Sequence, residues 1–398
     1  MKKSRWLALL ALLSAVMLLA AACGGDDDDG EDGGDAGADD IDCNWVIGTM
    51  GALSGDNATI GQPIFQGIEF AVEELNEAGD LPCTLELVDE DSQGDPAQAP
   101  PLAQSLVENE ELVAIVGPYF SGETLATGEI FSESGVAFIC PSCTGATIDD
   151  QGYETFFRAV ADDDVQGEVA GQYLTSLGGT VGIAHDNQDY SKGLADAVAA
   201  TVGDTQGPFI LSPGEEDSIP PVVTEITQAD PDLLFYGGYS AEAKPLVQQL
   251  REAGYEGTIV SDDGAKDSTF GEIGDAVEGL QVTCPCVDPL GIPEAEAFVT
   301  GINETYDRNP GTFAADAYDA TNLVAEALAE ADPEGAIEDV RASVVEYLRG
   351  ASYEGIAKTY AFTETGNLDI GPEGVYVYEW SSGDEDFVSL GPASELIE

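Results

Sequence analysis

The chain of 398 residues carries 77 acidic and 12 basic side chains, a formal net charge of −65 at pH 7. The long-range field of such a molecule repels phosphate groups, so nucleic acid and anionic lipid surfaces are excluded as partners. About 355 residues follow Asp42, enough for two compact domains.

Residues 1–22 have the pattern of a secretory signal peptide. Lys2, Lys3 and Arg5 precede a largely apolar run, and small residues stand directly before Cys23. A basic start, a short apolar segment and small residues before a cleavage point are typical of exported proteins. The run is shorter than the roughly 20 residues of a membrane-spanning helix, the alternative interpretation.

The residues around Cys23 look like a lipobox, although Ala20 stands where Leu is usual. We therefore predict that Cys23 is acylated and anchors the protein to the cell membrane, outside the cytoplasm. The lipidated Cys and the acidic segment after it, residues 23–43, are expected to form a disordered tether, because Gly and Asp dominate and no apolar face can be buried. Calcium binding by Asp26–Asp29 is disfavoured, since the alternating ligand spacing of a calcium loop is missing.

The remaining six cysteines face an oxidising compartment, where disulfides are the default. Six thiols allow 15 connectivities. We predict a Cys43–Cys83 bond, because each residue precedes an expected strand and those strands should be parallel neighbours. Cys140 and Cys143 have the spacing of a redox motif, but a structural bridge or two packed thiols is favoured. The pairing of Cys284 and Cys286 is left open.

From Trp45 onward, short apolar runs alternate with amphipathic helical stretches. The first half of the body has the order strand–helix repeated, which specifies a parallel sheet covered by helices on both faces. Strands are expected at 46–50, 85–88, 112–117 and 136–140, and helices at 64–75, 99–107 and 123–131.

The alternation of apolar strands and amphipathic helices begins again after Phe156 and predicts a second α/β unit. Its strands are expected at 180–184, 209–211, 233–236 and 257–260, and its helices at 165–177, 191–202, 222–226 and 241–253. Further helices are expected at 294–306, 314–329 and 337–348, with late strands at 359–362 and 375–378. The fold class is therefore α/β, with two doubly wound parallel-sheet lobes.

Ligands of such sheets bind outside the carboxyl ends of the strands. The loops that follow the strands are therefore the candidate site. They lie at 54–61, 119–124, 141–144, 185–190, 237–239 and 261–264.

At these loops the chain resembles the type I periplasmic binding proteins of the branched-chain amino-acid group of ABC transporters. The resemblance covers nearly all of 45–380, and its pieces keep the family's order and spacing. They are Ile47-Gly48 through Ser54-Gly55 with Gly61 and Gly67, Val116-Gly117-Pro118 with Ser121, the stretch 141–144, His185-Asp186 with Tyr190 and Gly193, the stretch 235–239, and 363–369.

The resemblance implies a site that grips an amino acid between two lobes. Ser121 and the backbone N–H of Thr144 would bind the carboxylate, and both loops open onto helix N-termini that favour an anion. The Thr144 hydroxyl and the Ser142 carbonyl would accept from the ammonium. From the second lobe, Asp263 would pair with the ammonium, and Tyr190 and Tyr239 would reach across to the ligand.

The pocket walls depart from the family pattern. Ile60 stands where an aromatic residue is common, and Asp263 stands where Glu is common, so its carboxylate is one methylene shorter. Ile60, Tyr119, Phe120 and Phe313 are the expected walls. A Leu-sized side chain transferred to such an apolar wall gains roughly 1.5–3 kcal/mol, which favours an aliphatic ligand.

The resemblance also implies three hinge crossings, near 158–164, 283–288 and 363–367. Lobe one would then comprise 44–160 plus 288–362, and lobe two 161–287 plus 363–398. Closure would be a hinge motion driven by contacts that the ligand makes only in the closed state.

We expect a ligand carrier and not an enzyme. His185 is the only histidine, and neither a Ser-His-Asp pattern, a phosphate-binding loop nor a metal-ligand cluster occurs. The implied partners are a small amino-acid-like ligand and an ABC transporter permease, with the protein a monomer without cofactor or metal. Open alternatives are a binding protein for short amides, urea or aromatic acids, a ligand sensor, and a thiol redox enzyme that uses Cys140 and Cys143.

The acidity predicts that the protein is adapted to a saline habitat. Salt shortens the Debye length from about 10 Å at 0.1 M to about 3 Å at 1 M, which weakens the repulsion between surface carboxylates. We expect the melting temperature to rise between about 0.05 M and about 2 M NaCl. A melting temperature that stays constant or falls over this range would contradict the prediction.

Overall fold

The computed structural model of the protein describes residues 43–397. The predicted signal peptide 1–22, the acylation site Cys23 and the tether up to residue 42 lie outside the described residues and stay predictions. Within the part that is described, no helix is both long and apolar enough to cross a membrane.

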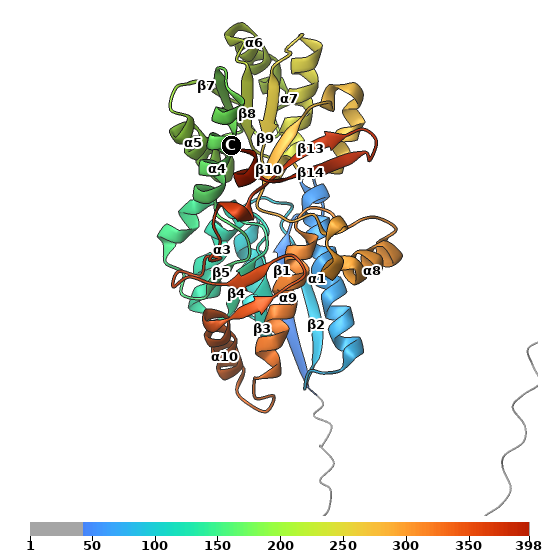
Figure 1. Ribbon diagram of the computed structural model, residues 1–398. Coiled ribbons are helices and arrows are strands. Elements are labelled where there is room, and N and C mark those ends of the chain that lie inside the picture. Colours follow the sequence, from blue (N-terminus) through green and yellow to red (C-terminus); the bar gives the residue numbers. More distant parts are fainter. Residues whose placement is uncertain (1–42, 398) are drawn as a thin grey trace, which may run out of the picture. The chain divides into compact units, whose positions relative to one another are not determined.

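The first sheet is fully parallel and has the strand order β2-β1-β3-β4-β5. Figure 1 shows it in the lower half of the molecule. Its strands are β1 (Asn44–Gly51), β2 (Thr84–Asp91), β3 (Leu112–Val116), β4 (Ala137–Cys140) and β5 (Phe156–Arg158), connected by α1 (Ala58–Ala78), α2 (Ala99–Val107) and α3 (Ser121–Glu133). The expected order of elements is confirmed, and β5 is an additional strand of three residues.

The second sheet has the order β14-β13-β10-β9-β8-β6-β7 and lies in the upper half of Figure 1. Its parallel strands are β6 (Val181–His185), β7 (Thr205–Ile210), β8 (Leu233–Gly237), β9 (Thr258–Ser261) and β10 (Gln281–Cys284), and its connecting helices are α4 (Asp163–Leu177), α5 (Asp189–Val202), α6 (Ile219–Ala229) and α7 (Ser240–Glu252). The strands β13 (Tyr376–Ser381) and β14 (Asp386–Pro392) add an antiparallel edge. The second sheet is therefore mainly parallel, as expected, and its two antiparallel edge strands are an addition to the expected parallel sheet.

After β10 the chain returns to the first sheet. The helices that follow are α8 (Glu296–Tyr306), α9 (Ala314–Ala329) and α10 (Ile337–Gly350), then the hairpin β11 (Ser352–Glu354) and β12 (Thr359–Ala361). Arg341 of α10 donates from Nε to the carbonyl of Leu112 in β3 at 2.7 Å. The chain thus passes between the two sheets three times, and the lobe boundaries given above remain a prediction.

Helix α1 packs closely against α9. Ile60, Ile64, Ile68 and Val72 recur every four residues and form its buried face. Gly67 lies against α9, where an added Cβ would approach the Ala314 carbonyl oxygen to 2.2 Å. A side chain at this position would push the two helices apart, so the glycine sets their spacing.

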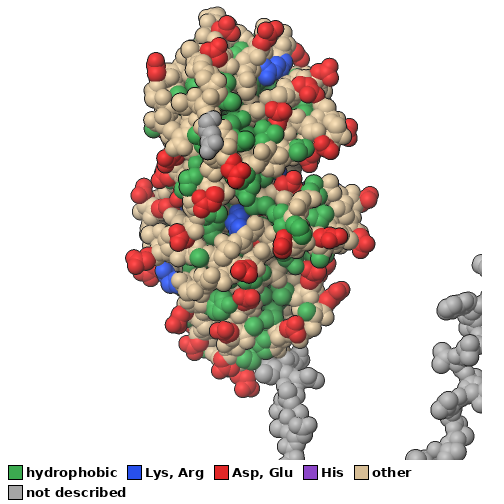
Figure 2. All heavy atoms as spheres, in the orientation of Figure 1, with side chains coloured by type: hydrophobic (Ala, Val, Ile, Leu, Met, Phe, Trp, Pro, Cys, Tyr) green, Lys and Arg blue, Asp and Glu red, His purple; other side chains and the backbone are tan. Residues whose placement is uncertain are grey.

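The surface carries the charge excess. Figure 2 shows Asp and Glu side chains spread over the whole visible face, with only a few Lys and Arg side chains among them. This distribution leaves the surface carboxylates without enough partners to neutralise them, which is the physical basis of the salt dependence predicted above.

The predicted disulfide Cys43–Cys83 is confirmed, with a Cα–Cα distance of 4.9 Å. Its cause is the strand pairing, because Asn44 of β1 lies opposite Thr84 of β2 and the two cysteines directly precede them. Cys140–Cys143 and Cys284–Cys286 are also bonded in the structure.

We predict that replacing Cys43 and Cys83 together by Ser lowers the free energy of unfolding. The bond joins residues 40 apart, and a loop of that length constrains the unfolded chain by about 4 kcal/mol in the entropic account. Urea unfolding in high salt measures the change. The matched control replaces Cys284 and Cys286 together by Ser. The bond between these two residues closes a much shorter loop, so its loss should lower the free energy of unfolding clearly less. An equal loss in both variants would contradict the prediction.

Candidate functional site

Two loops at the carboxyl ends of β3 and β4 supply the polar floor of the site. Ser121 begins α3, and its hydroxyl oxygen accepts from the Gly145 N–H at 2.9 Å, which leaves the hydroxyl proton free to donate. Ser142 donates to the Tyr119 carbonyl at 2.7 Å. Thr144 is 1% exposed, and its hydroxyl has no hydrogen-bond partner among the described residues. The hydroxyl proton of Ser121 and the unpartnered Thr144 hydroxyl are therefore available to a ligand.

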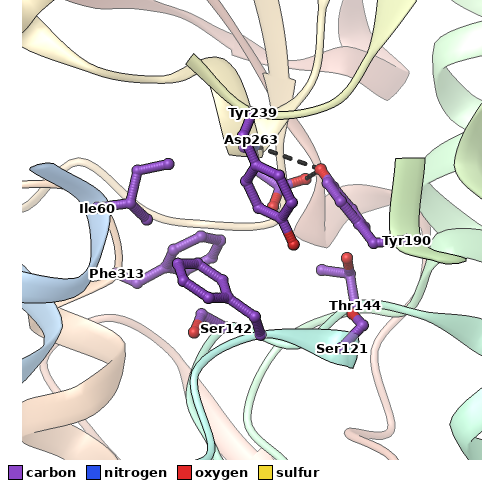
Figure 3. A pocket seen from close by; sticks show the side chains of 10 residues that line it. Ile60, Ser121, Ser142, Thr144, Tyr190, Tyr239, Asp263 and Phe313 are labelled. Carbon is purple, nitrogen blue, oxygen red and sulfur yellow. Dashed lines mark hydrogen bonds between the residues drawn. The ribbon is translucent and has the colours of Figure 1, made fainter. Parts of the chain in front are cut away.

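The second lobe contributes side chains from the carboxyl ends of β6, β8 and β9. Tyr190 lies in the first turn of α5, Tyr239 directly precedes α7, and Asp263 follows β9. The Tyr190 hydroxyl donates to Asp263 Oδ1 at 2.9 Å, a contact drawn in Figure 3. Gln166 of α4 donates to the same oxygen at 2.8 Å. The Asp263 carboxylate is therefore held in place before any ligand arrives.

All six predicted ligand-binding residues line one cavity. Figure 3 shows Ile60 and Phe313 to one side of this space, with Tyr190 and Thr144 on the other. The cavity is lined by Ile60, Phe120, Ser121, Ser142, Thr144, Tyr190, Tyr239, Asp263, Gly264 and Phe313. The tertiary structure thus brings an apolar end and a polar end into one space, as the sequence led us to expect.

One predicted wall residue is placed elsewhere. Tyr119 is fully buried beneath the loop, where its hydroxyl lies 2.7 Å from the Thr49 hydroxyl, and it does not line the cavity. Phe120, which was also predicted as a wall residue, does line the cavity, because successive residues of an extended segment point to opposite sides. The Tyr119 ring supports the floor from behind.

Contacts between the two lobes close the space. The rings of Phe120 and Tyr239 meet edge to face with their centroids 5.2 Å apart, and Tyr190 packs against Tyr239 at the same distance. Thr312 donates to the Lys266 carbonyl at 2.7 Å. The structure therefore represents an arrangement in which the loops of both lobes touch.

Phe313 is held in an unusual backbone conformation, with φ at 63°. A bulky residue in the left-handed region is strained by about 1–3 kcal/mol, and such strain clusters at ligand sites. The position directly before α9 directs the ring into the cavity wall. No feature of the sequence predicts the positive φ of Phe313.

Arg158 is a functional residue that the sequence analysis did not assign to the site. The side chain is fully buried, and it donates from Nη1 to the Thr144 carbonyl at 2.9 Å and from Nη2 to the Gly145 carbonyl at 3.1 Å. Nη2 also pairs with Asp149 at 2.8 Å. The guanidinium therefore fixes the backbone of the loop that presents Thr144.

Asp163 is a second residue that was missed. It is 2% exposed at the start of α4, its N–H donates to the Thr144 carbonyl at 2.8 Å, and neither carboxylate oxygen has a hydrogen-bond partner in the described structure. The Thr144 hydroxyl lies close enough to lower its pKa, although the two form no hydrogen bond of normal geometry. The unpartnered atoms of Asp163 and Thr144 mark a place that a cationic donor would satisfy.

Burial dominates the electrostatics of this polar end. Desolvation raises the pKa of Asp263 to about 6, against the opposing effect of the hydrogen bonds from Gln166 and Tyr190. Burial, and next the neighbouring Asp263 charge, raise the pKa of Asp163 well above its ordinary value. None of the residues that line the cavity is Lys, Arg or His. The site therefore lacks a positive charge of its own.

Glu123 holds the start of α3, which carries Ser121, from the other side. It is fully buried in the first turn of α3, accepts from the Phe120 N–H at 3.0 Å and from the Ser92 hydroxyl, and its pKa is raised by burial to about 7. Ser92 in turn donates its N–H to the Gly51 carbonyl at 3.0 Å. The ends of β1, β2 and β3 are linked through this one side chain.

The thiol redox alternative finds little support in the structure. Cys140 and Cys143 are fully buried, bonded to each other and placed on either side of Ser142. His185 ends β6, and its Nδ1 accepts from the Asn187 N–H at 3.0 Å. Both features stabilise loops next to the cavity.

Comparison with known proteins agrees with this geometry. The chain matches the periplasmic binding protein family over residues 44–385. It is 30% identical to the leucine-, isoleucine-, valine-, threonine- and alanine-binding protein of Pseudomonas aeruginosa, over 84% of this chain and 89% of the relative. Among solved structures, LivJ of Streptococcus pneumoniae in complex with isoleucine has a TM-score of 0.76 at 25% identity and covers 87% of this chain and 100% of its own.

The leucine-binding protein LivK of Thermotoga maritima is similar to the same degree, with a TM-score of 0.77 at 25% identity, covering 88% of this chain and 99% of its own. The match includes the first sheet, the second sheet except β14, and every loop that lines the cavity. The chain therefore belongs to the periplasmic binding protein family, whose members carry ligands and are not enzymes.

Proposed function

We propose that the protein is the extracytoplasmic substrate-binding component of an ABC importer and that it carries a branched-chain or similar aliphatic amino acid between its two lobes. The observation that supports this most directly is the division of one cavity into a polar end and an apolar end. A free amino acid with an aliphatic side chain has the same division.

The polar end suits a zwitterion. The Ser121 hydroxyl and the backbone N–H groups of the α3 N-terminus would donate to the ligand carboxylate, because free N–H groups at a helix start attract an anion. The ammonium would donate to Asp263 and to the Thr144 hydroxyl, and Asp163 lies beside them with unpartnered oxygens. In this arrangement the amine supplies the positive charge that the cavity lacks.

The apolar end suits a short aliphatic side chain. Ile60, Phe120 and Phe313 are each less than 9% exposed and offer no hydrogen-bonding side chain. A polar ligand side chain placed there would lose its water without finding a partner, which costs free energy. The relatives that are named leucine-, isoleucine- and valine-binding proteins support the same class of ligand.

The proposal includes the anchor and the transporter. Acylation of Cys23 would hold the carrier at the outer face of the membrane, with the acidic segment as its tether. The closed, loaded lobes would then deliver the amino acid to a permease. Closure supported by contacts such as Phe120–Tyr239 would distinguish the loaded protein from the empty one.

A thermal-shift screen in high salt tests the ligand. We expect L-leucine, L-isoleucine or L-valine to raise the melting temperature, since a ligand at 100 times its dissociation constant adds about 2.7 kcal/mol of stability. 4-Methylpentanoate lacks the ammonium and isopentylamine lacks the carboxylate, so neither should match the amino acid. Stabilisation by urea, short amides or benzoate without any effect of the amino acids would contradict the proposal and favour the alternative ligands.

Replacement of Arg158 tests whether the Thr144 loop holds the ligand. We predict that Arg158→Lys weakens amino-acid binding by about tenfold. The single ammonium of Lys lacks the planar fork whose two nitrogens bond both carbonyls and Asp149, and charge-assisted hydrogen bonds of this kind contribute about 1.5–3 kcal/mol. Isothermal titration calorimetry measures the change in Kd. Arg341→Lys is the matched control, since Arg341 is also buried and bonded to carbonyls of lobe one but lies away from the cavity; equal losses in both variants would contradict a specific role.

A further inference from the structure

The protein contains a second cavity, the outer cavity, next to the binding cavity that holds the proposed ligand site. Phe120, Tyr190 and Tyr239 line both cavities. The rest of the outer cavity is lined from both lobes by Gly94, Pro96, Gly122, Asn187, Gln188 and Asp189. The three aromatic side chains therefore form a partition between two neighbouring spaces.

The rings of the partition are held in different ways. The Tyr239 ring centroid lies 5.2 Å from those of Phe120 and Tyr190, and Figure 3 shows the two tyrosines side by side. The Tyr190 hydroxyl is fixed because it donates to Asp263 Oδ1 at 2.9 Å and accepts from the Gly264 N–H at 3.3 Å. The Phe120 ring has no polar atom, so packing alone holds it. Phe120 is therefore the part of the partition that can be shortened without the loss of a side-chain hydrogen bond.

Glycines on the lobe-one side keep the outer cavity open beside the Phe120 ring. A Cβ added to Gly94 would lie 3.1 Å from Phe120 Cε2, and the φ of Gly94 is 75°, a conformation that disfavours any side chain. A Cβ added to Gly122 would lie 2.7 Å from Pro96 Cγ. Neither position therefore has room for a side chain that would fill the space next to the ring.

The outer cavity has much more free space than the binding cavity. The volume that the centre of a water molecule can occupy is about 10 Å³ in the binding cavity and about 200 Å³ in the outer cavity. By this measure a single water molecule needs roughly 10–15 Å³. A ligand side chain in the binding cavity therefore presses against the walls, and Phe120 is a wall with free space on its other side.

We propose that Phe120 is a specificity-determining residue that sets the largest side chain the protein accepts, because its ring keeps the ligand out of the outer cavity. The inference rests on the proposed function for its amino-acid ligand. With the carboxylate at Ser121 and the ammonium at Asp263, a short aliphatic side chain ends at the apolar walls, and a longer one meets the Phe120 ring. Removal of the ring joins the two cavities, so the preference shifts towards long side chains while both head-group contacts remain.

Competition calorimetry with Phe120→Ala tests this size limit. One probe is L-leucine, or the aliphatic amino acid that gives the largest thermal shift. The other is O-benzyl-L-serine, whose ring lies two atoms further from Cα than the ring of L-phenylalanine. We expect the ratio of the Kd of O-benzyl-L-serine to the Kd of the aliphatic amino acid to fall by about tenfold or more in the variant, since the benzyl group then leaves water for the joined cavity. An unchanged ratio would overturn the proposal.

The matched control is Phe313→Ala. Phe313 lines the binding cavity and is absent from the lining of the outer cavity, so its truncation removes the same ring atoms without joining the two spaces. A ratio of two ligands measured on one variant also cancels any effect of the truncation on lobe closure. We expect the ratio to change clearly less in this variant than in Phe120→Ala. An equal fall in both variants would show that any enlargement of the wall is sufficient and would overturn the role of Phe120.

Phe120→Leu keeps the test decisive if Phe120→Ala does not fold. Leu retains an apolar side chain that is shorter than the ring, so the ratio should fall in the same direction by a smaller factor, and a constant or rising ratio would overturn the proposal. Failure of the wild type to bind any amino acid contradicts the proposed function, whereas amino-acid binding with an unchanged ratio in the Phe120 variants contradicts only this inference.

Discussion

The polar end of the cavity depends on buried carboxylates that form no ion pair with Lys, Arg or His in the part of the chain that the structure describes. Removing a charge from water costs several kcal/mol unless it is paired, so such groups are stable only if they are neutral, hydrogen-bonded or matched by a ligand. Gln166 and Tyr190 satisfy Asp263 in part, while Asp163 and Asp262 keep unpartnered oxygens. A cationic group that enters between the lobes therefore removes an unfavourable feature of the empty protein, and this difference favours closure around it.

The few basic residues are placed where they connect segments. Arg158 fixes the Thr144 loop, Arg341 joins α10 to β3, and Lys358 pairs with Asp316 at 2.6 Å and donates to the Pro285 carbonyl at 3.1 Å. Lys266 lies over the Tyr378 ring, 4.4 Å from its centroid. These four positive charges are thus used inside the fold, and most surface carboxylates depend on salt for screening.

The floor of the site is fixed by contacts from several directions. Arg158 binds the carbonyls of the Thr144 loop, Glu123 holds the start of α3, and the Cys140–Cys143 bond encloses Ser142. Hydrogen-bond donors that are fixed before binding lose little conformational entropy when the ligand arrives. Affinity for a small zwitterion therefore depends on residues that never touch it.

The sequence by itself determined the order of strands and helices, because apolar periodicity distinguishes a buried strand from an amphipathic helix. It also located the loops that carry Ser121, Thr144, Tyr190 and Asp263, since the carboxyl ends of parallel strands lie at one edge of a sheet. The family resemblance singled out these four residues within the loops. Strands β5, β10, β11 and β14 escaped prediction. The first three have only three or four residues, too few for a periodic signal, and β14 buries only Phe387.

Only the tertiary structure decided which acidic residues matter. The chain has 77 acidic residues, and nothing in the sequence distinguishes Asp163 and Asp262 from acidic residues on the surface. The structure shows that both are buried away from water. Burial and pairing arise from segments distant in sequence, as in the bond between Gln166 and Asp263, which are 97 residues apart. The contacts of Arg158 and the burial of the Tyr119 ring could not be predicted either. Neither the local sequence pattern nor the residue type specifies which distant segments a side chain contacts in the folded protein.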